Sequence, residues 1–121
     1  MSAPRKLVVV VDDDPSMLRG IQRLLTAKGF DTAVFPSAEA LLGSSVRHGA
    51  ACFLFDINLS GMSGIELRRR LALNGCTVPV IFMTAFDDEA TRREALAAGC
   101  IGYLNKPFAS DLLMGAIARI R

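Results

Sequence analysis

Five short apolar runs along the chain constrain its fold more than any other feature. Each has the length of a β-strand, and together they cover residues 7–11, 32–35, 52–55, 78–83 and 101–104. Segments with helical periodicity lie between them, so strand and helix alternate five times. This alternation predicts a doubly wound α/β domain, with a five-stranded parallel sheet, right-handed crossovers and helices on both faces.

The predicted helices are identified by apolar stripes and by the residues that begin and end them. The first stripe is closed by a Lys–Gly pair and consists of Met17, Leu18, Ile21, Leu24 and Leu25. Further stripes or capping signals cover residues 38–46, 63–71, 87–98 and 110–120. We therefore expect five helices, one after each strand.

The composition is typical of one compact globular domain, which we expect to span residues 1–121. Of the 121 residues, 51% are hydrophobic and 21% are charged, far from the composition of disordered chains. A formal net charge of +2 is too small to indicate a nucleic-acid or membrane surface. Three cysteines and one histidine form neither a disulfide framework nor a zinc site. With no recognisable signal peptide or membrane span, a cytoplasmic location is expected.

Polar residues follow four of the apolar runs, at the edge where open α/β sheets bind ligands. They are Asp12, Asp13 and Asp14 after the first run, Asp56 after the third, Thr84 after the fourth and Lys106 after the fifth. If the first and third strands are neighbours, the carboxylates, the hydroxyl and the lysine converge at one place. This convergence is the strongest functional signal in the sequence.

The acidic residues have different structural explanations. Asp14 precedes Pro15 and is explained as the N-cap of the first helix. Asp12 and Asp13 have no such explanation, because two poorly solvated carboxylates repel each other unless a cation or a proton lies between them. With Asp56 added, the oxygen ligands favour a hard cation, and Mg²⁺ fits best.

Lys106 has two interpretations that are compatible. Lys106 can be a counter-ion to the acidic residues, and together with Thr84 it can also hold phosphoryl oxygens. A carboxylate beside a metal can itself accept a phosphoryl group and form an acyl phosphate. Asp56, alone at the end of its strand, is the natural acceptor.

Other features have structural explanations. The run Arg68–Arg70 is interpreted as a solvated helix face and His48 as part of an exposed helix end. Aspartates follow the first strand where a nucleotide or flavin phosphate would need a glycine-rich loop. Flavodoxin-type cofactor binding is therefore disfavoured.

Four motifs together resemble those of response-regulator receiver domains, the phosphoacceptor modules of bacterial two-component signalling. They are Val-Asp-Asp-Asp at 11–14, Asp-Ile-Asn-Leu-Ser-Gly-Met-Ser-Gly at 56–64, Met-Thr-Ala at 83–85 and Gly-Tyr-Leu-Asn-Lys-Pro-Phe at 102–108. The resemblance covers essentially the whole chain. It implies the flavodoxin-like strand order 2-1-3-4-5, in which the first and third strands are neighbours.

The resemblance also assigns the acceptor and the metal ligands. Asp56 would accept a phosphoryl group from a histidine kinase or a histidine phosphotransfer protein. Asp12, Asp13, Asp56 and the backbone carbonyl of Asn58 would hold Mg²⁺, for which Mn²⁺ could substitute. A receiver is a signalling domain and not an enzyme, apart from self-phosphorylation by small phosphodonors and autodephosphorylation.

The remaining motif residues would form the switch. Thr84 and Lys106 would bind the phosphoryl oxygens, Tyr103 would turn inward as Thr84 moves, and the Lys106–Pro107 bond would be cis. The face made by the fourth helix, fifth strand and fifth helix would then change shape for a target, an output domain outside this chain or a second copy of the chain. Segments 36–42 and 62–67 are similar to those of receivers that precede LuxR-type DNA-binding domains, although this chain would not itself bind nucleic acid.

One departure and two rival interpretations remain. Ser60 stands where the family usually has proline, which predicts an altered metal affinity or phosphate lifetime. A haloacid-dehalogenase-like phosphatase would use Asp12 as its nucleophile, but it would leave Asp56 unexplained. The third interpretation is a receiver-shaped module that binds partners without phosphorylation.

Overall fold

The computed structural model describes residues 5–120, which form a parallel five-stranded sheet with the order β2-β1-β3-β4-β5. The strands are β1 (Leu7–Val11), β2 (Asp31–Phe35), β3 (Cys52–Asp56), β4 (Val80–Thr84) and β5 (Gly102–Asn105). Each lies within two residues of a predicted apolar run. The doubly wound α/β fold and its strand order are confirmed.

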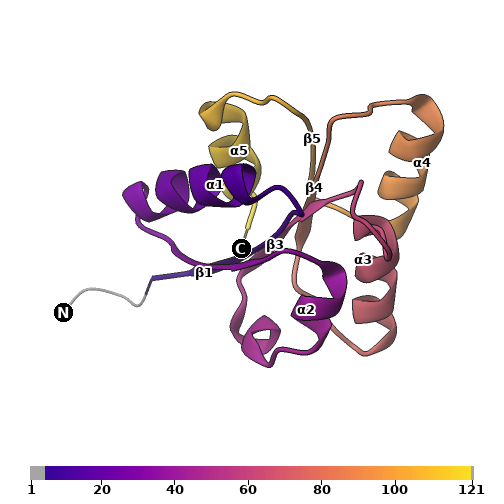
Figure 1. The fold of residues 1–121 in the computed structure, drawn as a ribbon, viewed down its shortest axis with the longest axis horizontal. Coiled ribbons are helices and arrows are strands. Elements are labelled where there is room, and N and C mark those ends of the chain that lie inside the picture. The colour runs from indigo at the N-terminus through magenta and orange to yellow at the C-terminus, as the bar shows by residue number, and fades with distance from the viewer. Residues whose placement is uncertain (1–4, 121) are drawn as a thin grey trace.

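Five α-helices cover the two faces of the sheet (Figure 1). They are α1 (Pro15–Ala27), α2 (Ala38–Leu42), α3 (Gly64–Leu73), α4 (Glu89–Ala98) and α5 (Ser110–Ile117). Helices α1 and α5 lie on one face, while α2, α3 and α4 lie on the other. None of the described helices is long and apolar enough to cross a bilayer.

Two hydrophobic clusters sandwich the sheet because alternate strand residues face opposite sides. Val9, Phe53 and Phe82 pack against α2, α3 and α4. Val10 and Leu54, one residue along in their strands, pack against α1 and α5. Strands β3 and β4 are buried along their whole length, as is typical of central strands covered on both faces.

The helix starts follow from their capping residues. Asp14 is the N-cap of α1, as predicted, and its carboxylate accepts a hydrogen bond from the backbone N–H of Ser16. Ser63 caps α3 through the N–H of Glu66, and Asp88 caps α4. These starts lie next to the carboxyl ends of β1, β3 and β4, so they fix the loops that carry the polar residues.

The prediction that residues 38–46 form one helix is wrong. Helix α2 ends at Leu42, and residues Val46–Gly49 form a separate 3₁₀ turn. Gly43 is the C-cap, and Ser44 Oγ accepts a hydrogen bond from the Val46 N–H, which favours a turn over continued helix. The apolar stripe therefore extends past the helix that it predicts.

Candidate phosphoacceptor and metal site

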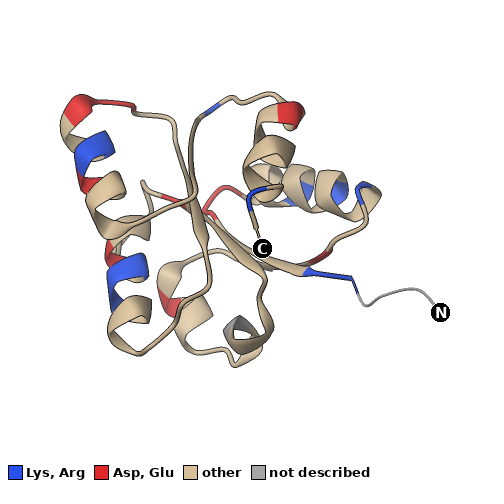
Figure 2. Cartoon of the chain, turned by 180° about the vertical axis from the view of Figure 1, so that it is seen from behind, with Lys and Arg blue, Asp and Glu red and all other residues tan. Residues whose placement is uncertain are grey.

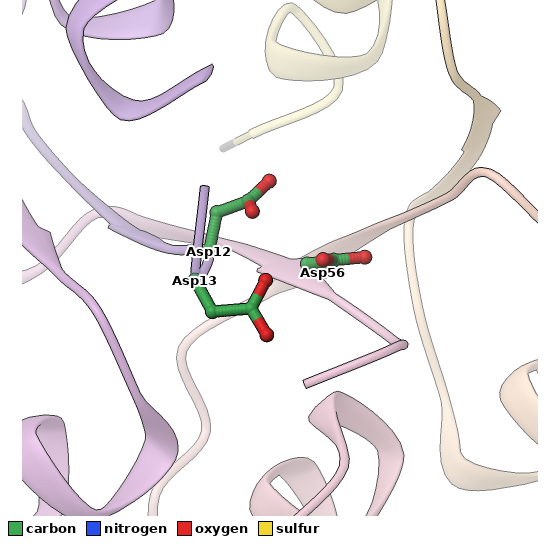
Figure 3. A group of neighbouring side chains, drawn as sticks. All are labelled: Asp12, Asp13 and Asp56. Carbon is green, nitrogen blue, oxygen red and sulfur yellow. The ribbon is translucent and has the colours of Figure 1, made fainter. Parts of the chain in front are cut away.

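The carboxyl ends of β1 and β3 bring three carboxylates together. The two strands pair in parallel, with Val11 opposite Phe55, so both end at the same edge of the sheet. Asp12 and Asp13 extend from the end of β1 and Asp56 from the end of β3 (Figure 3). One carboxylate oxygen from each of the three lies within 4.8 Å of the others.

Burial separates the three acids. Among the described residues, the buried polar side chains are those of Asp12, Asp56 and Thr84, all of which meet at this edge. Asp13 is exposed, so the prediction of two poorly solvated acids after β1 is wrong for this residue. Asp12 stays inside because its Oδ1 accepts the N–H of Asp14 at 2.9 Å, whereas Asp13 points outward toward Ser60.

Lys106 connects the two buried carboxylates. Its Nζ lies 2.6 Å from Asp12 Oδ2 and 3.3 Å from Asp56 Oδ2, with only 14% of its side chain exposed. The lysine is thus a counter-ion to the acids in this structure, and it lies where it could also contact a group on Asp56. The Lys106–Pro107 peptide bond is cis.

Burial and neighbouring charges shift the pKa values of both Asp56 and Lys106. Burial and the nearby charge of Asp12 raise the pKa of Asp56, although Lys106 and the Asn58 N–H oppose the shift. Burial opposes protonation of Lys106, but the hydrogen bond and charge of Asp12, with the charge of Asp56, raise its pKa above the ordinary value. A second cation near Asp56 would therefore be favourable.

Thr84, at the end of β4, is engaged by two neighbours. Its hydroxyl donates a 2.6 Å hydrogen bond to Asn58 Oδ1 and accepts the N–H of Phe86 at 3.0 Å. Asn58 lies two residues after Asp56, and its own N–H donates to Asp56 Oδ1. The resemblance implied only a backbone carbonyl ligand at Asn58, and nothing in the sequence pattern predicted the contact between its side chain and Thr84.

Ser60 contacts the exposed acid of the cluster. Both its backbone N–H and its hydroxyl lie 3.3 Å from Asp13 Oδ2. Proline, which the resemblance leads one to expect at this position, has neither donor. Ser60, at which this sequence departs from the family pattern, therefore contacts a candidate metal ligand directly.

Tyr103 is partly exposed and lies outside the acidic cluster. Its hydroxyl donates a 3.1 Å hydrogen bond to Asp87, and the guanidinium of Arg92 lies over its ring. The resemblance to receiver domains implied a switch role for Tyr103, whereas the sequence pattern identified Asp87 only as an acidic residue at a helix start. The pairing of these side chains depends on the loop between β4 and α4.

The donor set fits a hard divalent cation. Asp12, Asp13 and Asp56 supply carboxylate oxygens at one point, which is the ligand type that Mg²⁺ prefers. Burial, followed by the charge of Asp12, raises the pKa of Asp56, and a cation beside this carboxylate would stabilise its ionised form. The three carboxylates could therefore hold such an ion.

Comparison with known proteins gives the family. The model of the response regulator receiver domain family matches residues 8–118. The chain belongs to this family. Receivers of two-component systems are signalling domains rather than classical enzymes; histidine kinases phosphorylate them, and they bind Mg²⁺ at an acidic pocket.

The relatives are regulators of about twice the length of this receiver. It is 32% identical over 117 residues to the response regulator protein TmoT of Ectopseudomonas mendocina, covering 97% of the receiver and 53% of TmoT. It is also 32% identical to the transcriptional regulatory protein FixJ of Bradyrhizobium diazoefficiens, covering 91% and 54% of the two chains. The solved structure of the response regulator StyR superposes with a TM-score of 0.87 at 35% identity, covering 96% and 59%. The receiver thus spans about half the length of the curated relatives it matches.

Proposed function

We propose that this receiver accepts a phosphoryl group on Asp56 from a histidine kinase or a histidine phosphotransfer protein. The observation that carries the proposal is the position of Asp56, a buried carboxylate with Asp12, Lys106 and Thr84 gathered around it from neighbouring strand ends. Within residues 5–120, no other carboxylate has this set of neighbours, because Asp12 is already held by Lys106 at 2.6 Å and Asp13 is exposed.

In the proposed step, a carboxylate oxygen of Asp56 attacks phosphorus while the bond from phosphorus to the donor nitrogen or oxygen breaks. The leaving group keeps the electron pair, and an acyl phosphate forms on Asp56. Asp12, Asp13, Asp56 and the Asn58 carbonyl would hold Mg²⁺ or Mn²⁺. The bound ion would offset the negative charge of the carboxylates and of the incoming group.

Two further side chains would recognise the phosphoryl group. Lys106 lies 3.3 Å from Asp56 and could contact a phosphoryl oxygen by giving up part of its contact with the carboxylates. The Thr84 hydroxyl would donate to another oxygen after leaving Asn58. Tyr103 would turn inward as Thr84 moves. Because Lys106 contacts the phosphoryl group but is not the acceptor, Lys106→Ala should still accept the phosphoryl group on Asp56 but lose the movement of Thr84 and Tyr103.

The signal would leave through the face made by α4, β5 and α5. Because the relatives include a transcriptional regulator and are about twice as long, an output domain outside residues 1–121 is the proposed recipient. A second copy of the chain binding to the same face after phosphorylation is the other proposed outcome. The receiver would act in the cytoplasm as one domain, load from small phosphodonors and dephosphorylate itself.

The test is intact mass after incubation with acetyl phosphate, with and without Mg²⁺, for the native chain and Asp56→Asn. We expect one phosphoryl group on the native chain only when Mg²⁺ is present, and none on Asp56→Asn. Equal labelling of the two chains would overturn the acceptor assignment. Release of free phosphate without an adduct, at a rate that depends on Asp12, would instead favour the phosphatase alternative.

A further inference from the structure

Three mutual contacts hold the Tyr103 hydroxyl at the surface of the domain, while the side chain is partly buried and packs against the core. The Tyr103 hydroxyl donates to Asp87 Oδ1 at 3.1 Å, and Arg92 Nη2 donates to Asp87 Oδ2 at 2.8 Å. The Arg92 guanidinium carbon lies 5.2 Å from the centre of the Tyr103 ring, a distance at which cation–π attraction is favourable. Each of the three side chains therefore contacts the other two, and we call them the Tyr103 cluster.

Three segments supply the Tyr103 cluster, namely a strand, a helix and the loop before that helix. Tyr103 lies in β5, where it pairs with Phe82 of β4, while Arg92 lies in α4 and Asp87 in the loop before that helix. Figure 2 shows acidic positions at the start of α4 and basic positions further along the same helix. The Tyr103 cluster thus ties the start of α4 to the edge strand of the sheet.

The loop that holds Asp87 also begins at Thr84. The Phe86 N–H donates to the Thr84 hydroxyl at 3.0 Å, and Asp87 is the next residue. A displacement of Thr84 toward Asp56 would break this bond and move the loop. The outward position of Tyr103 therefore depends on the same segment that Thr84 would move.

We propose that Asp87 and Arg92 are positioning residues that stabilise the outward position of Tyr103, and that they thereby set how readily this receiver enters its phosphorylated conformation. This inference rests on the proposed function, in which Thr84 and Tyr103 move together. An inward turn of Tyr103 breaks its hydrogen bond to Asp87 and removes its ring from Arg92. Weakening the Tyr103 cluster shifts the equilibrium toward the inward state without touching the acceptor site.

Electrostatics around the Tyr103 cluster agree with this role. The hydrogen bond from Arg92 lowers the pKa of Asp87, so the carboxylate is ionised over the neutral range and accepts both bonds. Burial and the hydrogen bond to Asp87 raise the pKa of Tyr103, so its hydroxyl keeps the proton that it donates. Donors and acceptor are thus in the states that the contacts require.

The chain offers a direct probe, because Tyr103 is its single tyrosine. In protein labelled with fluorotyrosine, the one fluorine NMR resonance reports the surroundings of Tyr103 in the unphosphorylated chain. Asp87→Asn and Arg92→Met should each move this resonance toward its position in the native chain treated with acetyl phosphate and Mg²⁺. Glu89→Gln and Arg93→Met, which make the same charge changes at exposed positions of α4, should leave it in place.

The second readout is the rate of labelling by acetyl phosphate. Because a cation–π contact and an exposed charge pair are each weak, we expect Asp87→Asn and Arg92→Met to speed labelling about three- to tenfold, with the control variants unchanged. Asp56→Asn must remain unlabelled. A resonance and a labelling rate that match the native chain in both cluster variants would overturn the inference. A native chain that remains unlabelled would overturn the proposed function. Even then, a fluorine resonance that moves in Asp87→Asn but not in Glu89→Gln would show that Asp87 holds Tyr103.

Discussion

Charged residues have different roles at the two ends of the parallel strands, which we call the carboxyl edge and the amino edge of the sheet. At the carboxyl edge, Asp12 and Asp56 are buried beside each other with Lys106 as their common counter-ion. At the amino edge, exposed Arg5 donates to the carbonyl oxygens of Thr26 and Gly29 and thereby satisfies the end of α1. The first arrangement places two carboxylates out of water around one lysine, whereas the second completes backbone hydrogen bonding.

Glycines at the two ends of α3 offer the largest expected contrast. Gly64 lies at the carboxyl edge, where an added Cβ would collide with the carbonyl oxygen of Asp56 and lie 3.2 Å from Ile57 Cα. We expect Gly64→Ala to lower the free energy of unfolding by about 3 kcal/mol. Gly75, beyond the other end of α3, has open space and a φ of +82°, so Gly75→Ala should cost only about 1 kcal/mol.

Urea unfolding of both glycine variants measures this difference. Equal losses at Gly64 and Gly75 would contradict the claim that the backbone behind Asp56 is packed without room for a methyl group.

Removal of the lysine tests the cost of the buried acids. Lys106→Met leaves Asp12 and Asp56 without their counter-ion, so we expect a loss of about 2 kcal/mol in metal-free buffer, of which added Mg²⁺ restores part. Urea unfolding with and without Mg²⁺ measures both quantities. Lys28→Met, at an exposed position after α1, is the control and should be close to neutral. A Lys106 variant as stable as this control would show that the acids need no counter-ion.

An amino-edge arginine should affect stability alone. Arg119 Nη1 donates to the carbonyl oxygen of Ile101 at 2.6 Å, just before β5. Arg119→Met should lower the free energy of unfolding by about 1 kcal/mol and leave the rate of phosphoryl uptake at the native value. Thermal unfolding and mass labelling check the two statements, and slowed labelling would mean that the two edges are not independent.

Neutralising Asp56, the proposed acceptor, should stabilise the metal-free protein. Burial and the charge of Asp12 raise the pKa of Asp56, so its folded-state pKa lies above its unfolded-state value. The ionised carboxylate therefore costs stability at neutral pH; this cost shrinks as the pH falls below the folded-state pKa and vanishes below the unfolded-state pKa. Asp56→Asn should be more stable than the native chain at pH 7, by less than the Lys106 effect, with the difference shrinking in acid. A variant less stable at pH 7 would reverse the sign of this argument.

The smallest expected effect is at Ser60. Ser60→Pro removes both donors to Asp13 Oδ2, and each is long at 3.3 Å, so we expect Mg²⁺ to bind about two- to threefold more tightly. Ser60→Ala, which keeps the backbone N–H, should give a smaller change in the same direction. Calorimetric titration with Mg²⁺ measures both, and unchanged affinity in Ser60→Pro would remove any role for Ser60 at the metal site.

The sequence predicted the elements and the strand ends because these depend on local patterns. Apolar runs located all five strands, and Asp14 followed by Pro15 predicted the start of α1. Sequence patterns did not predict features that depend on the local backbone conformation. The exposure of Asp13 depends on the turn after Asp12, and the end of α2 depends on Gly43 rather than on the apolar stripe.

The sequence predicted Lys106 as a counter-ion to the acidic residues, but it did not predict two other contacts between side chains from separate segments. Asn58 and Thr84 lie 26 residues apart and meet only because β3 and β4 are neighbours in the sheet. Asp87 and Tyr103 meet through the loop between β4 and α4. Residue types and spacing predicted which groups would gather at this edge, but hydrogen bonding among them required the folded backbone.

The most direct test of the account is to identify which aspartate carries the phosphoryl group. After labelling with acetyl phosphate and Mg²⁺, reduction of the acyl phosphate with borohydride marks the modified residue for peptide mass mapping. The account predicts the mark on Asp56 alone. A mark on Asp12 or Asp13 would contradict it, because the buried carboxylate beside Lys106 and Thr84 would then not be the acceptor.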